Sequence, residues 1–596
     1  MLLQTSDWLI IAAFFVVILS IGVLTSKRAG KNATEFFLSG RNMPWWLLGV
    51  SMVATTFSTD TPNLVTDLVR THGVSGNWLW WAFLLTGMLT VFVYAKLWRR
   101  SKVMTDIEFY EIRYSGKPAA FLRGFRALYL GVFFNVMIMA TVSLAAIKIG
   151  GVLLNLEPLP TIAVALLVTV VYAGLGGLRS VLATDFFLFT FAMFGAVMAA
   201  VVAVQLPEVN GLGNLFSHPN VVGQLRLLPD FSDPSTLIPV LVIPLAVQWW
   251  SVWYPGAEPG GGGYLVQRML SAKNEKNAMG ATLFFNAAHY ALRPWPWIIV
   301  ALASLIVFPD LSSLTEAFPH INPNILRHDL AYPAMLTFLP TGLLGIVVAS
   351  LVAAYISTIN SHLNWCSSYV VNDFYTRFIK PNATEKEKVA VGRISTVVLM
   401  VLAGSIALLL SNALQAFHIL LQIGAGTGLI FILRWFWWRI NAFTELTGML
   451  VSFVVAVYLE IIHAKLGFEP FPSYVNLLIG VSITTTAWLA VTLLTRPADD
   501  EILRDFYNLV RPGGNGWDAF LKKMQEQGKA ITDTATPGDL PLGILCMVVG
   551  CLAVYSAVFA AGFYLYGNLL PAIISTVLAA GSILFLVRTW GKLEMK

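Results

Sequence analysis

Long apolar runs recur from one end of the chain to the other, and they restrict its fold more than any other feature. Each run is long enough to cross the roughly 30 Å hydrocarbon layer of a bilayer, which takes about 20 helical residues. Only 12% of the 596 residues are charged, about half the share in soluble proteins. Lipid offers backbone groups no hydrogen-bond partner, so segments that cross it must be helical. The sequence therefore predicts an all-α integral membrane protein.

The apolar runs predict about fifteen transmembrane helices. Their approximate ranges are 7–26, 45–70, 78–97, 127–154, 161–179, 185–205, 236–255, 278–308, 341–371, 389–411, 413–433, 442–463, 473–495, 541–566 and 569–588. Most of the 38 Lys and Arg residues lie on the cytoplasmic side if the N-terminus is outside and the C-terminus is cytoplasmic. This asymmetry follows the positive-inside rule. We expect a multi-pass protein of the plasma membrane, or of the inner membrane in a Gram-negative cell.

A polar segment interrupts the second apolar run at residues 54–62 (ATTFSTDTP). Ser and Thr side chains compete for helical hydrogen bonds, and Pro62 lacks a backbone donor. Asp60 or Thr61 could cap a helix that restarts near Pro62. The segment favours a broken helix whose free carbonyls line a cavity and bind a cation. A kinked helix with hydroxyls bonded back to its own carbonyls is the alternative.

A second polar segment, residues 353–364 (AAYISTINSHLN), lies within the long run 341–371. Helical spacing places four small or hydroxyl-bearing side chains on one face, namely Ala354, Ser357, Thr358 and Ser361. Adjacent hydroxyls with small neighbours admit a hard cation. Hydrogen bonding between packed helices is the alternative reading, and it is common for small polar residues in membranes.

Together these segments and the motifs around them resemble the sodium/solute symporter family, which includes bacterial proline, sialic acid and galactose transporters and the sodium/glucose cotransporters. The resemblance extends from Phe36 to about Tyr375. Its motifs, in order, are FLSGR at 37–41, TDIEFYEIRY at 105–114, YAGLGGLRSVLATD at 172–185, QRMLSAK at 267–273, LPTGLLGIVVASLVAAYIST at 339–358 and NDFY at 372–375.

The resemblance implies a sodium site between the broken helix and the later polar helix. Its ligands would be the backbone oxygens of Ala54, Phe57 and Ala354 and the hydroxyls of Ser357 and Thr358. Some family members hold a second sodium, which here would use Asp185, Asn360 and Ser361. Asn360 departs from the hydroxyl expected there. Asp185 could instead pair with Arg179 or another cytoplasmic-side charge.

The resemblance also implies the leucine-transporter fold, in which two inverted five-helix repeats surround the site. The predicted parts are an extra helix and loop at 1–44, a first repeat at 45–205, an extracellular loop at 206–235, a second repeat at 236–433, additional helices at 434–496, a cytoplasmic connection at 497–540 and C-terminal helices at 541–596. The connection contains a short helical pattern around 517–527. It would lie on the membrane surface or pack on the inner face of the transporter.

A solute pocket would lie beside the sodium site. Its candidate residues are Asp60, Thr61, Asn63, Asn77, Trp80, Trp81, Trp249, Trp250, Trp253, Tyr254 and His289. Lys148 and Arg293 also lie near membrane depth, where they could pair or snorkel. Sugar-binding members carry a glutamine where this chain has Thr61, and an intramembrane lysine close to His289. The stretch 255–263 (PGAEPGGGG) looks like an insertion near the inner gate, and the glycine run within it, 260–263, would be a flexible hinge or a loop.

These features predict sodium-coupled symport of a small polar organic solute, with a sugar slightly favoured over an amino acid, a carboxylate or a nucleoside. A proton-coupled transporter of the same fold, with Asp60 or His289 carrying the proton, is the main alternative. We find no phosphate-binding loop for ATP and no catalytic constellation, so we expect neither an enzyme nor a cofactor other than the coupling ion. The +6 net charge reflects topology, and neither nucleic acid nor an obligate protein partner is expected.

Overall fold

The computed structural model describes residues 3–26, 33–173, 178–251, 258–410, 420–424, 426–529, 531 and 539–594. These described parts are helices joined by short connections, with no β-strand among them. One isolated β-bridge joins Met43 to Ala272. The predicted all-α architecture is confirmed for this part of the chain.

Eleven helical stretches among the described residues are long and apolar enough to cross a bilayer. They are Thr5–Gly22, Val74–Ser101, Gly116–Leu154, Leu178–Gln205, Glu275–Val307, Leu343–Ile379, Glu385–Ala407, Ala442–Lys465, Ser473–Leu494, Leu540–Leu565 and Leu569–Leu593. Four shorter apolar stretches, Trp45–Thr56, Pro158–Thr169, Pro234–Ala246 and Leu420–Phe436, fall within other predicted spans. The total of about fifteen crossings stays a prediction.

Side chains on the outer helices explain why such a bundle needs lipid. Leu494 is 86% exposed and Val587 is 68% exposed, and many other apolar side chains on the peripheral helices are also uncovered. A water-soluble protein rarely exposes so much contiguous apolar surface. These faces therefore contact acyl chains, and the protein is a multi-pass membrane protein.

The helices of the first half follow the predicted spans loosely. They are α1 Thr5–Ser26, α2 Ala33–Leu38, α3 Trp45–Thr56, α4 Asp60–His72, α5 Trp78–Trp81, α6 Leu84–Leu89, η3 Thr90–Tyr94, α7 Ala95–Ser101, α8 Phe109–Arg113, α9 Gly116–Leu128, η5 Tyr129–Phe134, α10 Asn135–Leu154, α11 Pro158–Ala173, α12 Leu178–Gln205, α13 Leu212–Ser217, α14 Pro219–Val222, α15 Pro234–Leu237, η6 Ile238–Val242, α16 Ile243–Ala246 and η7 Gln248–Trp250.

The second half of the chain is also built from long helices with short ones between them. They are α17 Gly263–Ser271, α18 Glu275–Ala287, η8 Ala288–Leu292, α19 Pro294–Val307, α20 Leu311–Ala317, η9 His328–Leu330, α21 Ala331–Leu336, α22 Leu343–Ser368, η10 Tyr369–Ile379, α23 Glu385–Ala407, α25 Gly428–Phe436, α26 Ala442–Val457, η11 Tyr458–Ile462, α27 His463–Lys465, α28 Ser473–Leu494, α29 Asp500–Val510, α30 Asp518–Glu526, α31 Asp539–Leu565 and α32 Leu569–Glu594.

The predicted break in the second apolar run is confirmed. α3 ends at Thr56, Phe57 adopts an extended conformation, and α4 begins at Asp60. The predicted cap is wrong by one residue, because Thr59 precedes the first turn of α4 and Asp60 already lies inside it. Pro62 still falls in the first turn, where its missing N–H costs nothing.

Some predicted boundaries are also wrong. The helix expected from residue 127 begins at Gly116 and continues for 39 residues through a π-helical segment, η5. Its first turns carry Lys and Arg, which periodicity in an apolar window does not detect. The span expected at 236–255 is divided into short helical pieces up to Trp250, and Val247 between them has a non-helical conformation.

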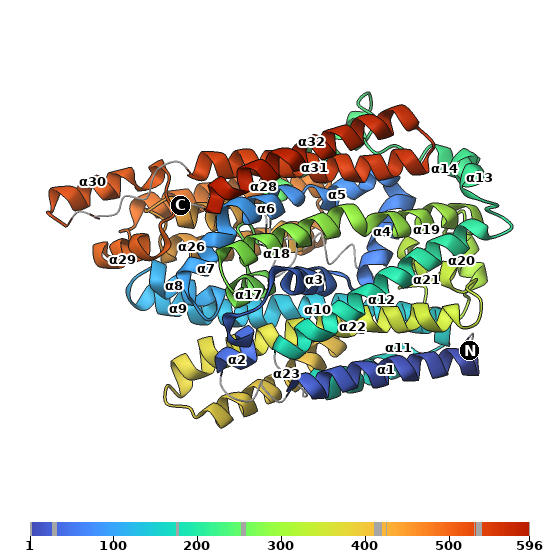
Figure 1. Ribbon diagram of the computed structural model, residues 1–596, viewed down its shortest axis with the longest axis horizontal. Helices are drawn as coiled ribbons and strands as arrows, with labels where there is room; N and C mark the ends of the chain where they lie inside the picture. Colours follow the sequence, from blue (N-terminus) through green and yellow to red (C-terminus); the bar gives the residue numbers. More distant parts are fainter. Residues whose placement is uncertain are drawn as a thin grey trace.

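Most long helices lie along the long axis of the molecule in Figure 1. The centre of the bundle is formed by α3, which packs against α12, α18 and α22. α1 covers α12 and α22 from one side, while α31 and α32 pair with each other at the opposite edge (Figure 1). The two halves of the broken helix therefore lie in the interior, surrounded by other helices.

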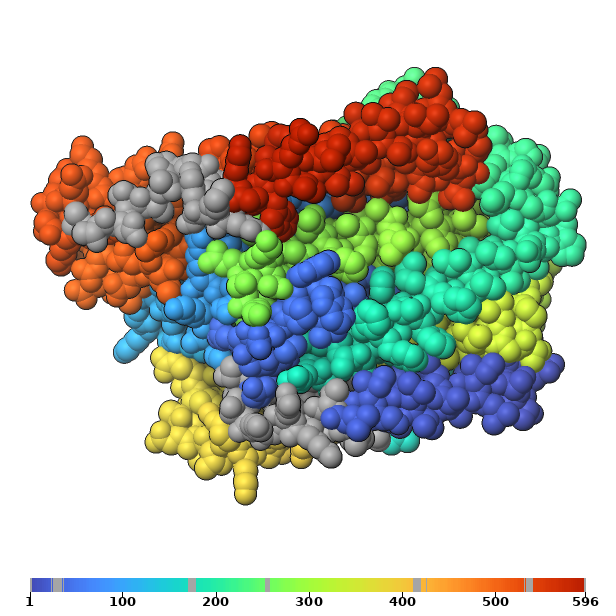
Figure 2. Space-filling model, in the orientation of Figure 1, coloured from blue at the N-terminus to red at the C-terminus, as the bar shows by residue number. Residues whose placement is uncertain are grey.

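The connection predicted at 497–540 contains two short helices, α29 and α30, of which the sequence indicated only the second. Figure 2 shows this segment at one end of the molecule. Trp517 is fully buried and donates from Nε1 to the Trp435 carbonyl at 2.9 Å. Phe506 packs on Phe109, with ring centroids 5.6 Å apart. The segment thus packs on one end of the helical bundle.

Candidate functional site

The polar helix α22 meets the broken helix at the break. The Thr358 hydroxyl donates to the Thr55 carbonyl at 2.8 Å and lies 3.5 Å from the Phe57 carbonyl. The Phe57 N–H bonds back to the carbonyls of Val53 and Ala54. α3 ends here, so its last carbonyls have no helical donor. A hydroxyl of α22 therefore lies among carbonyl oxygens that the break has released.

The predicted sodium ligands lie together at this junction. Ala54, Phe57, Ala354, Ser357 and Thr358 are each at most 2% exposed. The Ser357 hydroxyl donates to Asp185 Oδ1 at 2.6 Å. A hydroxyl that donates its proton in one direction still offers lone pairs in the other. The arrangement brings neutral oxygen atoms of α3 and α22 close together in the interior of the bundle.

The residues predicted for a second sodium lie in a polar cluster that Ser357 joins to the first site. Asp185 on α12 accepts hydrogen bonds from Ser51 and Ser357. The Arg268 guanidinium lies 4.0 Å from Asp185 and donates to the Ser361 hydroxyl at 2.8 Å. Asn360 is buried in the same stretch of α22. Of the two partners considered for Asp185, the structure supports another basic residue, Arg268, rather than Arg179.

The predicted solute residues on α4 lie at the start of the helix. Asp60 and Thr61 are partly exposed, and the Ser58 hydroxyl donates to Asp60. The Thr61 hydroxyl donates to the Thr56 carbonyl at 3.3 Å and so spans the break. Asn63 is buried, and its amide has no hydrogen-bond partner within the described residues. These side chains stay available to a polar ligand at the break.

Other predicted solute residues bond mainly to each other. The Trp80 indole donates to Asn77 at 2.8 Å, and Asn77 donates to the Val74 carbonyl. His289 lies edge-on to Trp80 with ring centroids 5.4 Å apart. Trp81 is fully buried. Trp249 and Trp250 contact each other edge-on, while Trp253 and Tyr254 lie outside the described residues.

Arg293, between η8 and α19, reaches the break, a role that the sequence analysis did not assign. Its guanidinium donates to the Val53 carbonyl and to the Thr56 hydroxyl, both at 3.2 Å. It also bonds to His289 Nδ1 and lies over the rings of Phe57 and Trp297. A basic residue inside an apolar span signals function by itself, but its partner could not be read from the sequence.

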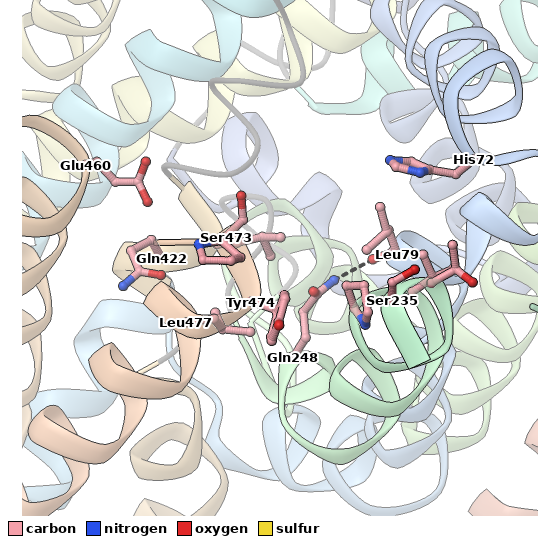
Figure 3. Close-up of a pocket in the computed structure, with 14 residues that line it drawn as sticks. His72, Leu79, Ser235, Gln248, Gln422, Glu460, Ser473, Tyr474 and Leu477 are labelled. Atoms are coloured by element: carbon pink, nitrogen blue, oxygen red, sulfur yellow. Dashed lines mark hydrogen bonds between the residues drawn. The ribbon is translucent and has the colours of Figure 1, made fainter. Parts of the chain in front are cut away.

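A cavity of about 330 Å³, which several polar side chains line, lies near the C-terminal end of α4 (Figure 3). Side chains from separate helices surround it, including His72, Ser235, Gln248, Gln422, Glu460, Ser473 and Tyr474. The Gln248 amide donates to the Leu79 carbonyl at 2.6 Å, and the Gln422 amide donates to the Asn476 carbonyl at 2.7 Å. The sequence analysis missed both glutamines, although a lone amide in an apolar span is an available signal.

The profile of the sodium:solute symporter family matches residues 36–452. The chain belongs to this family. The symporter is 24% identical to the sodium/glucose cotransporter of Vibrio parahaemolyticus, over 81% of this chain and 90% of that protein. It is 26% identical to human sodium/myo-inositol cotransporter 2, over 78% of this chain and 71% of that protein. The family resemblance inferred from the sequence motifs is confirmed.

The fold of the symporter is shared with a solved structure. A sodium-coupled sialic acid symporter in a substrate-bound outward-open state superposes with a TM-score of 0.64 at 21% identity, covering 83% of this chain and 99% of that one. At this identity the likeness establishes the fold. The division into inverted repeats at 45–205 and 236–433 stays a prediction.

A second region of the symporter, around Arg126 and Glu258, contains buried charged contacts. Arg126 pairs with Glu258 at 2.6 Å, and the two side chains are 3% and 1% exposed. Nearby, Asp106 accepts a bond from the Gly263 N–H at 2.8 Å and another from the Tyr369 hydroxyl. These contacts tie α9 and η10 to the glycine run before α17. The molecule therefore combines a cavity lined by polar side chains with a set of buried charged contacts elsewhere in the bundle.

Proposed function

We propose that this symporter uses the inward movement of sodium to drive uptake of a small polar organic solute across the plasma membrane. The observation that carries the proposal is the Thr358 hydroxyl beside the Thr55 and Phe57 carbonyls at the break. A monovalent cation gains about 2.3 kcal/mol per 100 mV on crossing the membrane inward. An ion bound there would link the broken helix to α22.

The sodium ligands in this proposal are the carbonyls of Ala54, Phe57 and Ala354 and the hydroxyls of Ser357 and Thr358. Hard cations prefer oxygen ligands, and unwound backbone at the membrane midplane is a recurrent cation site in transporters. The Thr358 hydroxyl bonds to the Thr55 carbonyl. Sodium would take its place among these oxygens, and so hold α3 and α22 in one arrangement.

For the solute, we propose a neutral sugar or polyol as the first class to test. The two relatives named above are cotransporters of glucose and myo-inositol. Partly exposed Asp60 and Thr61, and the unpartnered amide of Asn63, offer donors and acceptors at the break. Arg293 beside the same break is a specific reason to include small carboxylates in the panel.

The transport cycle in this proposal is alternating access between two inverted repeats, 45–205 and 236–433. The cavity lined by polar side chains and the buried contacts of Arg126 suit a state that is open to the outside, with the N-terminus outside and the C-terminus in the cytoplasm. Sodium would complete the pocket, the solute would permit the outer side to close, and loss of sodium inside would release the solute.

The test is thermal stabilisation of the purified symporter in sodium chloride against choline chloride, with sugars, polyols, amino acids, carboxylates and nucleosides. A ligand that binds the folded state raises its apparent stability. We expect one solute class to stabilise only when sodium is present, and Thr358→Ala to abolish the sodium effect. Thr190→Ala is a matched control, because Thr190 is exposed and bonds only to Phe186 of its own helix.

Proton coupling is a second candidate, favoured by one observation. Asp60 is a carboxyl group at the break that is partly exposed and accepts a bond from Ser58. If uptake follows an imposed pH gradient, ignores sodium and is lost in Asp60→Asn, the sodium proposal is wrong and the proton-coupled mechanism replaces it.

A further inference from the structure

A second cavity, of about 290 Å³, lies between α1, α10, α11 and α22. Its walls are largely apolar, unlike those of the cavity in Figure 3. The hydroxyl groups among its lining residues are those of Thr59, Thr161 and Tyr355. Each of these hydroxyls bonds within the protein, at 2.9 to 3.1 Å. A buried water needs two to four polar partners, so this cavity suits an apolar occupant.

The cavity opens sideways between α1 and α11. Both helices pack on α22 and lie at the same edge of the molecule (Figure 1). Trp8 of α1 and Val164 of α11 line the cavity, yet they are 45% and 58% exposed. Their neighbours Leu9 and Leu167 are also exposed, so the surface around the opening contacts lipid. The cavity is therefore continuous with the lipid-facing surface of the bundle.

The cavity follows the helices from one end of the bundle toward its middle. One end is lined by Trp8, in the first turn of α1, and by Leu156, just after α10. Tryptophan is enriched at the membrane–water interface, so this end lies near the lipid headgroups. The other end is lined by Thr59 at the break and by Ile356 in the middle of α22.

The length of the cavity matches one leaflet of a bilayer. On α22 the lining extends from Val348 to Ile356, a helical rise of about 12 Å. Half of the hydrocarbon layer measures about 15 Å. An empty cavity of this kind would lack dispersion contacts on its walls. Because the opening faces lipid, a hydrocarbon chain is the group that can supply those contacts.

We propose that this cavity binds one acyl chain of a bilayer phospholipid. The chain enters between α1 and α11, with its ester end near Trp8 and its terminal methyl beside Thr59 and Ile356. Thr59 lies at the break, and Ile356 precedes Ser357 in α22. A bound lipid thus packs beside the broken helix. The inference depends on apolar contacts alone and does not depend on the proposed function.

Photo-crosslinking of the full chain in phosphatidylcholine nanodiscs tests the proposal. A small share of the lipid carries a diazirine on one acyl chain, and labelled residues are mapped by mass spectrometry. A diazirine near the terminal methyl should label Thr59 and Ile356, and one near the ester should label Leu156. Thr59 and Ile356 are buried, so lipid on the outer surface does not reach them. Label on the exposed Val577 of α32 is the internal reference.

Filling the cavity should exclude the chain. Ala165 lines the cavity from α11, and Ala165→Phe should lower the labelling of Ile356 at least about fivefold relative to Val577. Ala163→Phe is the matched control, because Ala163 is an exposed residue of the same helix outside the cavity lining. It should leave this ratio unchanged. Ala146→Phe fills the cavity from α10 and replaces Ala165→Phe if size-exclusion chromatography shows that the latter does not fold.

The wild-type chain alone can overturn the inference. If its label is confined to exposed residues such as Val577, the cavity binds no acyl chain, whether or not the variants fold. The inference is also wrong if both diazirine positions label the same residues. Labelling of Ile356 that persists in the filled variants, or that falls equally in Ala163→Phe, contradicts it as well. None of these readouts involves sodium or solute, so failure of the proposed function would leave them unaffected.

Discussion

Two buried ion pairs near opposite ends of the bundle have the same length but different surroundings. Lys148 of α10 pairs with Asp329 at 2.6 Å, and Arg126 of α9 pairs with Glu258 at 2.6 Å. Asp329 lies in η9, next to α21, which packs on α10, α19 and α4. Glu258 instead precedes a glycine run in which Gly260 and Gly261 have φ values of +82° and +91°.

The difference lies in what each pair holds. The first pair joins helices that pack closely on both sides. If one partner is lost, the surrounding helices cannot easily rearrange to stabilise the charge that remains. The second joins a helix to a turn whose glycines can change conformation at little steric cost. The comparison predicts that the first contact serves mainly stability, whereas the second would control conformation if the glycine run acts as a hinge.

Lys148→Met should produce the largest effect. It leaves Asp329 buried without its cation, and breaking a buried pair on one side costs about 3–5 kcal/mol. Thermal unfolding followed by tryptophan fluorescence should show a large fall in the midpoint. The double variant Lys148→Met with Asp329→Leu should recover much of it, because no uncompensated charge remains. Equal losses in the single and double variants would contradict this role for the pair.

Trp517→Ala tests packing at the cytoplasmic connection, through a residue that belongs to neither ion pair. Trp517 is fully buried, and the Arg113 guanidinium lies 5.1 Å from its ring centre. Loss of a buried tryptophan costs about 3 kcal/mol or more, which should release α29 and α30 without unfolding the rest. Limited proteolysis should then cut within 500–526 faster, while the main unfolding midpoint stays close to wild type. Trp8→Ala, at a side chain that is 45% exposed, is the matched control.

Glu258→Gln should destabilise less than Lys148→Met, because the molecule can open and hydrate Arg126. The loss of stability in Glu258→Gln is then limited by the free energy needed to open this end of the molecule. We expect a loss of about 1.4 kcal/mol, which corresponds to a tenfold increase in the population of the open conformation. A cysteine placed at Thr427, which lines a small cavity beside Arg126, should react about tenfold faster with a thiol reagent.

The same Thr427→Cys reporter in the Lys148→Met background should label at the wild-type rate below its unfolding temperature. If both backgrounds label equally fast, or if Glu258→Gln loses as much stability as Lys148→Met without any change in labelling, the two pairs have the same role.

Gln248→Leu should have the smallest effect. It removes the bond from Gln248 to the Leu79 carbonyl at the wall of the polar cavity, and a single hydrogen bond contributes about 1 kcal/mol. The unfolding midpoint should fall slightly. Ser473→Ala, on an exposed residue of the same cavity, should stay within about 0.5 kcal/mol of wild type. A larger loss at Ser473 would show that the cavity wall depends on other contacts.

The sequence by itself determined the class of the protein and the position of its break. Long apolar runs require helices in lipid, and residues 54–62 interrupt one of them with groups that compete for its backbone bonds. The motifs identified the family. The polar face of α22 also followed from helical spacing: Thr358 on this face bonds to the broken helix, and Ser357 bonds to Asp185 of α12. All of these signals are local, because they depend on neighbours within a few turns.

Only the tertiary structure decided which charged groups meet. Arg268 contacts Ser51 across 217 residues and Ser361 across 93, and Arg126 meets Glu258 across 132. Sequence analysis recognised Asp185 as a site residue and Arg293 as a group at membrane depth, but could not assign their partners. Periodicity shows which face of a helix is polar, whereas the identity of the facing helix depends on how the whole bundle packs. A buried charge must find its counter-charge across that packing, so the pairing is a property of the fold.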